Sequence, residues 1–367
     1  MAKKIVMISN SFYSLFSFRI ELLTLLNKEY EIFLFCPIEE KAGDKPEQFE
    51  AMNIHTRAMC MDRRGTDPFK EFKLCGEIKK YIKEVMPDLV ITLTIKPNIY
   101  AGLACANLGI PYIANITGLG TAFLKDNLLK KVTVALYKRA LRKCNMVFFE
   151  NTENQRIIKE CGILKGPSTV TTGAGVNLER FKKKPYPGDG NETYLFIGRL
   201  MKEKGIEEFL FCAEKMKEKY PDTHYIIVGF YDDAYEERVN KLIEKGVIEY
   251  HKFTNEPEKY MEKCSVLVQP SYHEGMSNVC LETAATGRPI LVSDIPGCRE
   301  TVIDGESGFK FKSKSADSLL EAMEKFHNLS YEEKVKMGEA GRRHMEKSFD
   351  RNAVVNTHMS VIKSIIG

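Results

Sequence analysis

The sequence predicts an α/β protein with a doubly wound parallel sheet in each half. The chain has 367 residues, which is enough for two domains with separate cores. In each half short apolar runs alternate with helical patterns, an arrangement typical of parallel sheets. A segment rich in Pro, Gly and charge separates the halves and predicts a linker. We therefore expect domains at 1–180 and 193–348, a linker at 181–192 and a terminal apolar-periodic helix at 349–367.

The first half opens with a strand–helix–strand pattern. Lys4–Ile8 and Glu31–Phe35 are typical of buried strands, and Phe18–Leu26 has helical spacing. Parallel sheets bind ligands beside the carboxyl ends of their strands. The Gly-x-Gly-x-x-Gly fingerprint of dinucleotide enzymes is absent, which counts against an NAD or FAD enzyme. Four side chains are then expected beside the site, with the last near the helix start: Asn10, Ser11, Phe12 and Arg19.

Further strands are predicted along the first half at Asp88–Thr92, Pro111–Ile116 and Met146–Phe149, with a helix at Pro97–Gly109. The strand at Pro111–Ile116 empties into a loop with two glycines, which lets a ligand approach the backbone. An ordinary turn explains the same residues equally well. The candidate ligand contacts in this loop are Thr117, Gly118 and Gly120.

Residues 128–144 form a predicted amphipathic helix with an apolar stripe and many cations. Such a helix can lie on an anionic membrane surface. It can equally be an ordinary surface helix with a solvated basic face, and the sequence leaves both readings open. The cations are Lys130, Lys131, Lys138, Arg139, Arg142 and Lys143.

The second half repeats the strand–helix alternation and contains the most informative stretch, Ser271–Glu282. Strands are predicted at 193–197, 223–229, 247–253, 266–270 and 289–293, with a helix at 206–219. Ser271–Glu282 follows an apolar strand and leads into a helix with Ser277 or Asn278 at its N-cap. Free N–H groups at such a helix start bind phosphate.

An acidic residue lies on each side of this helix start. A carboxylate repels a bare phosphate, so these two residues need another role. Glu274 and Glu282 can instead accept hydrogen bonds from the hydroxyls of a sugar diol. Arg199 and Lys204 follow the first strand of the second half, where cations can neutralise a diphosphate. These residues together suggest a nucleotide-sugar site, while a capped helix with solvated charges is the plainer alternative.

Composition narrows the class of protein further. The net charge of +4 gives no reason to expect a nucleic-acid partner. The ten cysteines are scattered without metal-binding spacing, which favours reduced thiols. No signal peptide precedes the first strand, and no apolar run is long enough to span a membrane. We therefore expect a cytoplasmic protein, with peripheral contact at the inner face of the cell membrane.

Two motifs in the second half resemble those of retaining glycosyltransferases of family 4, also called glycosyltransferase group 1. They are Glu274-Gly-Met-Ser-Asn-Val-Cys-Leu-Glu282 and, earlier in the chain, Gly198-Arg-Leu-x-x-x-Lys204-Gly. The later turns beginning at Asp294 and Asp304 are similar to that family too. The resemblance implies the GT-B fold: two Rossmann-like domains facing across a cleft, with a C-terminal helix crossing back to the N-terminal domain.

The resemblance also implies roles for individual residues. Glu274 would bind the transferred sugar, Arg199 and Lys204 would stabilise the departing diphosphate, and Glu282 would bind the ribose. It implies neither a metal nor another cofactor, since cations and a helix dipole can replace a metal. The remaining donor-binding residues would be Gly198, Phe253, Thr254, Gly275, Met276, Ser277, Asn278 and Val279.

The first half carries a weaker resemblance to one bacterial subgroup. Many family members have a histidine after the strand that here ends at Ile116, whereas this chain has Thr117-Gly-Leu-Gly120. That loop and Lys96–Tyr100 look like transferases that add HexNAc sugars to undecaprenyl-diphosphate-linked glycans. The implied reaction moves a sugar, HexNAc in this subgroup, from a UDP-sugar to a lipid-linked acceptor or a growing surface or capsular polysaccharide.

Two other functions fit parts of the same pattern. A UDP-sugar epimerase of similar architecture would need acid and base residues on both sides of the sugar, and the first half offers no clear carboxylate pair. A non-catalytic nucleotide-sugar-binding subunit would not need an intact set of Arg199, Lys204, Glu274 and Glu282. Slow donor hydrolysis without acceptor would separate the transferase from the binding subunit.

Overall fold

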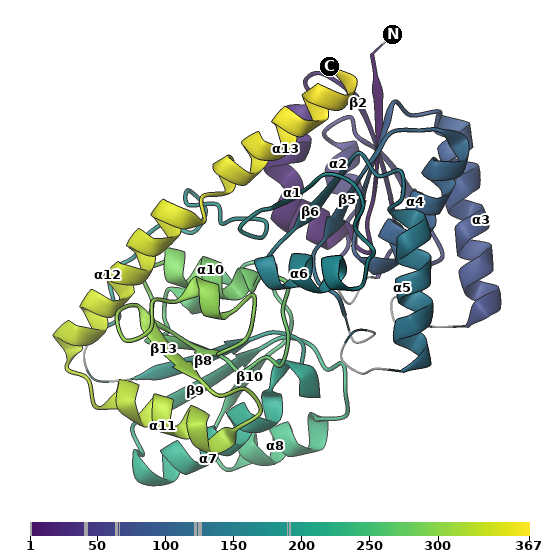
Figure 1. Cartoon of the computed structure of the whole chain (residues 1–367). Helices are drawn as coiled ribbons and strands as arrows, with labels where there is room; N and C mark the ends of the chain where they lie inside the picture. Colours follow the sequence, from purple (N-terminus) through teal and green to yellow (C-terminus); the bar gives the residue numbers. More distant parts are fainter. Residues whose placement is uncertain are drawn as a thin grey trace. The chain divides into compact units, whose positions relative to one another are not determined.

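A computed structural model describes residues 2–39, 43–62, 65, 67–120, 123, 127–188, 190 and 192–367. The chain divides into two compact units (Figure 1). Unit 1 comprises residues 1–174 and 352–367, and unit 2 comprises residues 175–351. Each unit is a parallel sheet covered by helices on both faces, which confirms the predicted α/β class with two Rossmann-like halves.

The sheet of unit 1 has seven parallel strands in the order β3-β2-β1-β4-β5-β6-β7. The order reverses between β1 and β4, where Ile5 pairs with Leu89. Ligands of doubly wound sheets bind beside the carboxyl ends of strands at such a reversal. The strands are β1 (Lys4–Ile8), β2 (Glu31–Cys36), β3 (His55–Ala58), β4 (Leu89–Leu93), β5 (Tyr112–Ile116), β6 (Met146–Phe149) and β7 (Ser168–Val170).

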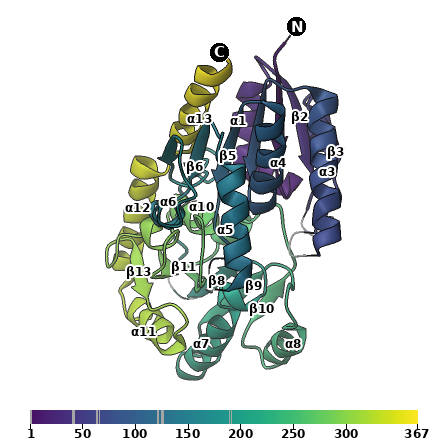
Figure 2. The same ribbon diagram turned by 45° about the vertical axis from the view of Figure 1, so that its right-hand side comes forward.

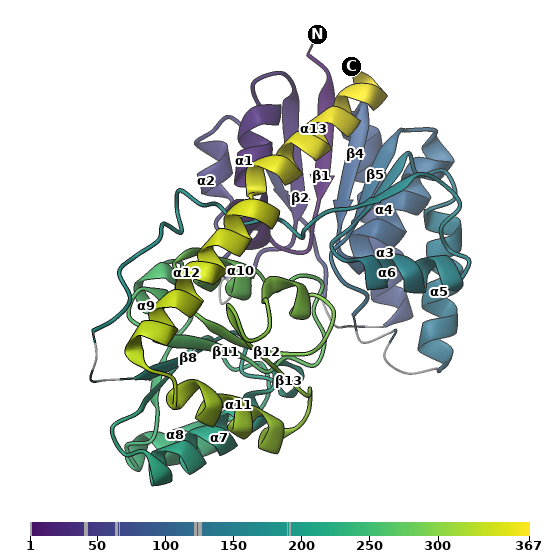
Figure 3. The ribbon, with the colours of Figure 1, turned by 60° about the vertical axis from the view of Figure 1, so that its left-hand side comes forward.

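The side chains of each strand alternate between two cores, as period-two geometry requires. Val6 and Ile8 face α3, α4 and α5, which stand side by side in Figure 2. Ile5 and Met7 face α1, α2 and the C-terminal helix α13, which lies along this face in Figure 3. The helices are α1 (Phe12–Leu26), α2 (Glu47–Glu50), α3 (Pro68–Val85), α4 (Ile95–Leu108), α5 (Leu128–Ala140), α6 (Thr152–Glu160) and α13 (Arg351–Ile366).

The terminal helix belongs to unit 1 although it follows unit 2 in the chain. Val355, Ile362 and Ile366 of α13 are buried in the same core as Ile5 and Met7. This packing confirms the predicted return of the C-terminal helix to the N-terminal domain.

The sheet of unit 2 has six parallel strands in the order β10-β9-β8-β11-β12-β13. Its order reverses between β8 and β11. The strands are β8 (Thr193–Ile197), β9 (His224–Val228), β10 (Glu249–His251), β11 (Val266–Gln269), β12 (Ile290–Ser293) and β13 (Gly308–Phe311). The helices are η3 (Lys202–Lys204), α7 (Ile206–Lys219), α8 (Glu236–Glu244), α9 (Glu258–Met261), α10 (Asn278–Ala285), η4 (Arg299–Thr301), α11 (Ala316–His327) and α12 (Tyr331–Ser348).

Two elements differ from the sequence-based expectation. Helix α1 begins at Phe12 rather than Phe18, because the Ser11 hydroxyl caps it by accepting the Ser14 N–H at 3.2 Å. The earlier start was not predicted, because the prediction relied on the apolar spacing of the later residues. Arg19 therefore lies in the middle of the helix and not near its start.

The segment 181–192 was predicted as a linker, and the structure assigns its described residues to unit 2. Phe181 is buried in the second core of that unit. The Lys184 N–H donates to the Thr286 carbonyl at 3.1 Å, and buried Arg288 donates to the Pro185 carbonyl at 2.8 Å. These contacts were not predicted, because the Pro and Gly content of the segment is typical of a linker. Asp189 and Asn191 of the segment lie outside the described residues.

Candidate functional site

The loops that follow β8 and β11 flank the point where the strand order of unit 2 reverses. The first loop carries Gly198, Arg199 and Lys204, and the second is the stretch from Ser271 to Ser277. Gly205 has φ +73°, and a Cβ there would lie 2.1 Å from the Pro270 carbonyl oxygen. Glycine at this position therefore lets the two loops pack closely.

Lys204 and Glu274 meet across this reversal. The Lys204 Nζ lies 2.5 Å from Glu274 Oε1, and both side chains are largely buried. The same oxygen accepts the Ser271 hydroxyl at 2.8 Å and the Gln269 amide at 3.3 Å. Glu274 Oε2 has no hydrogen bond within the described residues. One oxygen is thus held by the protein, and the other remains to accept a ligand hydroxyl.

The surroundings keep Glu274 ionised. Burial works to raise the pKa of this carboxyl, but the Lys204 ammonium and the hydrogen bonds from Lys204 and Ser271 outweigh it, so its pKa lies below its usual value. Burial lowers the pKa of neighbouring His273, although Glu274 opposes the shift. The Nε2 atom of His273 is buried without a hydrogen-bond partner in the described residues. A lowered pKa makes His273 a weaker proton acceptor, and no partner orients its ring through Nε2, which together favour a structural role.

Helix α10 presents its uncapped N-terminus at the same edge of the sheet. Ser277, one of the two predicted candidates, is its N-cap, and the Ser277 side chain makes no cap hydrogen bond. The N–H groups of the first turn have no partner within the helix and can bind an anion. The Ser277 N–H itself donates to the Gly297 carbonyl at 2.8 Å, so it is not one of the available donors. Gly297 has φ +83°, and a Cβ there would lie 2.4 Å from the Gly275 carbonyl oxygen.

Glu282 lies just over one turn into α10 and is only 7% exposed. Its carboxyl has no hydrogen bond within the described residues. Burial raises the pKa of Glu282 to about 7, although the charges of Arg351 and Arg180 oppose the shift. These guanidinium groups have their own anchors: Arg351 donates to the Gly175 carbonyl at 3.2 Å, and Arg180 pairs with Glu258 at 3.1 Å. Glu282 is therefore a buried carboxyl that can accept a diol.

The other residues predicted to bind the donor have separate contacts of their own. Arg199 is half exposed and forms an ion pair with Asp232 at 2.6 Å instead of joining Lys204. Phe253 packs edge-on against Phe230, with ring centroids 6.2 Å apart. Thr254 accepts the Glu256 N–H at 3.0 Å. Met276 is buried in the core of unit 2, and Val279 packs against it, so their side chains are structural.

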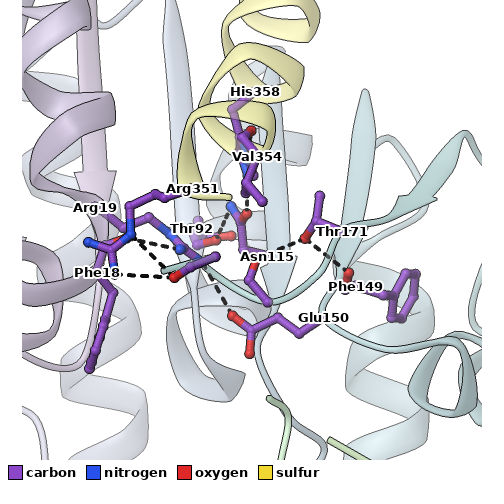
Figure 4. Close-up of polar contacts among 12 residues, drawn as sticks. Phe18, Arg19, Thr92, Asn115, Phe149, Glu150, Thr171, Arg351, Val354 and His358 are labelled. Atoms are coloured by element: carbon purple, nitrogen blue, oxygen red, sulfur yellow. Dashed lines mark hydrogen bonds and ion pairs between the residues drawn. The ribbon is translucent and has the colours of Figure 1, made fainter. Parts of the chain in front are cut away.

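The carboxyl edge of the unit 1 sheet carries a buried polar cluster (Figure 4). Arg19 pairs with Glu150, which follows β6, at 3.3 Å. Asn115 of β5 donates to the Thr92 carbonyl at 3.1 Å, and its Oδ1 lies 2.9 Å from His358 Nε2 of α13. Burial, reinforced by the Arg19 charge, lowers the pKa of His358 to about 4. This cluster thus connects α1 and α13 to the ends of the central strands.

The predicted acceptor-side residues separate into two groups. Asn10 follows β1 and the loop of Thr117, Gly118 and Gly120 follows β5, so these four residues lie at the carboxyl edge. The prediction that the Phe12 side chain contacts the acceptor was wrong. Its ring is fully buried and packs against Phe49 at 6.0 Å, because α1 begins at this residue.

Sequence reasoning missed several supporting residues. Ser271 and Gln269 lie within the motif region, and a count of donors available to Glu274 would have pointed to Ser271. Lys96 pairs with Glu71 of α3 at 2.5 Å and donates to the Asp62 carbonyl at 2.6 Å, contacts between residues distant in the sequence. Arg180 and Arg351 have no local signal, since they come from distant parts of the chain.

Within the described residues no group of three or more His, Cys, Asp or Glu side chains is arranged to hold a metal ion. No described helix is both long enough and apolar enough to cross a membrane.

The chain matches two models of protein families. Residues 4–151 match the family described as glycosyl transferase 4-like, and residues 178–344 match glycosyl transferases group 1. The second match contains Lys204, Glu274 and Glu282.

Two relatives of this chain match most or all of its length. The chain is 25% identical to an N,N'-diacetylbacillosaminyl-diphospho-undecaprenol alpha-1,3-N-acetylgalactosaminyltransferase of Campylobacter jejuni, over 99% of both chains. It is 26% identical to a UDP-Gal:alpha-D-GlcNAc-diphosphoundecaprenol alpha-1,3-galactosyltransferase of Escherichia coli, over 82% of this chain and 80% of that one.

Among solved structures, Anabaena HepE in complex with UDP and glucose superposes with a TM-score of 0.79 at 15% identity, covering 99% of this chain and 100% of that one. Sucrose-phosphate synthase of Thermosynechococcus elongatus gives a TM-score of 0.79 at 17% identity, covering 99% of both chains. At such low sequence identity, both similarities show the fold alone. The chain belongs to the group 1 glycosyltransferases and has the GT-B architecture of two Rossmann-like halves.

Proposed function

We propose that this enzyme is a retaining transferase that moves a sugar from a UDP-sugar to an undecaprenyl-diphosphate-linked glycan. Unit 2 binds the donor and unit 1 binds the acceptor. The transferred sugar is an N-acetylhexosamine. The reaction takes place in the cytoplasm, at the inner face of the cell membrane, during assembly of a surface polysaccharide.

The observation that carries the donor part is the convergence of Lys204, Glu274 and the α10 N-terminus at one strand reversal. Each part suits a different portion of a nucleotide-sugar. The helix start and Lys204 suit the diphosphate, Glu274 Oε2 suits a hydroxyl of the transferred sugar, and Glu282 suits the ribose diol. An NAD-type site would instead place a glycine-rich turn at the reversal.

Charge development explains how this arrangement would accelerate transfer. When the bond between the sugar and the diphosphate breaks, negative charge grows on the leaving diphosphate. Lys204 and the dipole of α10 are held in place before that charge appears, which is the condition for electrostatic catalysis. Arg199 can add a second cation if its pair with Asp232 opens. These groups support a reaction that needs no metal ion, with no further cofactor.

The acceptor part is supported by the relatives and by the edge of unit 1. The named C. jejuni and E. coli relatives act on diphosphate-linked undecaprenol sugars. In unit 1, Asn10 and Thr117–Gly120 lie at the carboxyl edge of the sheet, where doubly wound folds bind ligands. The basic face of α5 suits the anionic surface in which such an acceptor would be embedded. An epimerase and a non-catalytic subunit are not favoured, because the named relatives are transferases.

A panel of nucleotide-sugars tests the donor assignment directly. A ligand that binds only the folded protein raises its melting temperature, so UDP-N-acetylhexosamines should stabilise the enzyme more than GDP- or ADP-sugars. The Glu282→Ala variant should lose that stabilisation. Equal shifts with all bases would refute the UDP assignment. EDTA should leave transfer intact, and a strict requirement for added Mg²⁺ would refute the metal-free mechanism.

A further inference from the structure

Helix α3 carries two phenylalanines that are almost fully exposed. Phe69 is 87% exposed and Phe72 is 83% exposed. They lie three positions apart in the first turns of the helix, so their rings share one face. Exposed aromatic pairs are uncommon on soluble surfaces, because each ring loses favourable burial. Neither ring is needed for packing within unit 1.

Helix α5 adds a second apolar group. Leu128 is 76% exposed, Leu129 is 42% exposed and Val132 is 48% exposed. All three lie in the first turns of α5, well before the basic residues Lys138 and Arg139 in its last turn. The exposed large apolar side chains of α5 therefore lie at its N-terminal end.

The two groups lie at the same edge of unit 1. Helices α3 and α5 follow parallel strands β3 and β5, so each helix starts at the carboxyl edge of the sheet. Helix α4 packs against both of them and lies between them (Figure 2). The candidate acceptor loop Thr117–Gly120 leaves β5 at this edge too. Exposed apolar side chains therefore accompany the proposed acceptor site.

Lysines lie beside these side chains, and two nearby acidic residues have partners of their own. Lys70 and Lys73 are exposed on α3, and Lys131 is exposed on α5. Asp67 caps α3 by accepting the Phe69 N–H at 2.9 Å, and Glu71 pairs with Lys96. Exposed rings beside lysines complement a surface with anionic headgroups above an apolar layer.

We propose that Phe69 and Phe72 of α3, together with Leu128, Leu129 and Val132 of α5, insert into an anionic lipid bilayer. We call these five side chains the insertion edge. The lysines hold the headgroups, and the insertion edge enters the layer beneath them. Membrane binding would then have two contributions. Salt screens the attraction between the basic α5 face and the headgroups, whereas the burial of apolar side chains persists in high salt. The proposal rests on the proposed function for its orientation, since a lipid-linked acceptor would enter from the same bilayer.

The lack of tryptophan in the chain provides a sensitive reporter of insertion. The Phe72→Trp variant would contain a single tryptophan, whose emission shifts to shorter wavelength on entering an apolar layer. We expect this shift with vesicles of phosphatidylglycerol and phosphatidylethanolamine, and quenching when brominated lipids are included. Lys83→Trp, eleven residues further along the same helix and about 16 Å away, is the matched control and should respond to neither.

A second pair of variants measures binding itself. Phe69→Gln/Phe72→Gln should weaken vesicle binding in high salt by about tenfold or more, because two apolar rings no longer leave water. Met86→Asn removes an apolar side chain that is 74% exposed at the opposite end of α3 and should bind as the wild type does. Both proteins should keep the wild-type melting temperature, since exposed substitutions change stability little.

Three results would overturn the proposal. An unshifted Phe72→Trp emission in vesicle-bound protein would mean purely electrostatic docking. Undiminished high-salt binding of Phe69→Gln/Phe72→Gln would exclude a role for the rings. Dimers that dissociate in this variant, without vesicle binding in the wild type, would assign the edge to a second copy of the chain. Transfer to a short, water-soluble acceptor analogue tests the proposed function separately, because it needs no membrane.

Discussion

The Lys204 ammonium lies 2.5 Å from Glu274 Oε1, so the two residues proposed to hold opposite parts of the donor bind each other. Their pairing neutralises a largely buried carboxylate before any ligand arrives. It also leaves Oε2 as the oxygen that can accept a ligand hydroxyl. A donor diphosphate that attracts Lys204 would weaken the pair and strengthen the acceptor character of Glu274.

Removing one partner of this pair should cost more than removing both. Lys204→Ala leaves the buried Glu274 carboxyl without its cation, so it should lower the free energy of unfolding by about 1–3 kcal/mol. Lys204→Ala/Glu274→Gln should recover much of that loss, since no unpaired charge remains. Urea denaturation of the single and double variants measures both values. Purely additive losses would show that the two residues are not coupled.

Ser271 should act on the reaction through Glu274. The Ser271→Ala variant loses the 2.8 Å hydrogen bond that fixes Oε1, so kcat should fall by about tenfold, the scale of one hydrogen bond to a charged group. Losing this donor also raises the pKa of Glu274, which moves the acid limb of the pH–rate profile upward. Ser271→Thr keeps the hydroxyl and should restore the wild-type profile. An unchanged acid limb in Ser271→Ala would contradict the positioning role.

Donor binding should depend on pH through Glu282. Its pKa is raised to about 7, and only the ionised carboxylate accepts both hydroxyls of a diol. Affinity for UDP-N-acetylglucosamine should therefore fall about tenfold between pH 8 and pH 6, as proton binding competes. Calorimetry should use the UDP-sugar and not UDP, because the terminal phosphate of UDP itself titrates near neutral pH. Glu282→Gln should bind more weakly, with an affinity that is flat over this range.

The same carboxyl should reduce stability as the pH rises. Because the pKa of Glu282 is higher in the folded chain than the ordinary value of 4.5, the folded protein binds more protons at intermediate pH. The stability contributed by the protonated form is complete below pH 4.5 and is lost as the pH rises through about 7. Glu282→Gln should therefore gain up to about 3 kcal/mol on the wild type between pH 5 and pH 8. A constant difference between the two proteins would contradict the raised pKa.

The fold could be predicted because apolar periodicity reports burial directly. The strands at Lys4–Ile8, Met146–Phe149 and Thr193–Ile197 have the predicted limits, since each is a continuous apolar run between polar turns. The start of α1 at Phe12 was missed because Ser11 acts through a single side-chain cap. The anchoring of residues 181–188 was missed because it depends on Arg288, about a hundred positions later.

The candidate site could be predicted only in part. Glu274 and Lys204 were identified from spacing and family likeness, yet their direct pairing depends on how two loops pack beside Gly205. The raised pKa of Glu282 depends on burial and on Arg351, which no local pattern reveals. Exposure of Phe69 and Phe72 was likewise invisible, since phenylalanine in a helical pattern ordinarily indicates core.

The most direct test of the account is sugar transfer by the wild type and the Lys204→Ala variant. Each protein is given a labelled UDP-N-acetylhexosamine and an undecaprenyl-diphosphate-linked sugar in EDTA, and the labelled lipid is counted. The account predicts transfer by the wild type and a kcat lowered by a larger factor than KM is raised in the variant. No labelled lipid from any UDP-sugar, or an unchanged kcat in the variant, would contradict it.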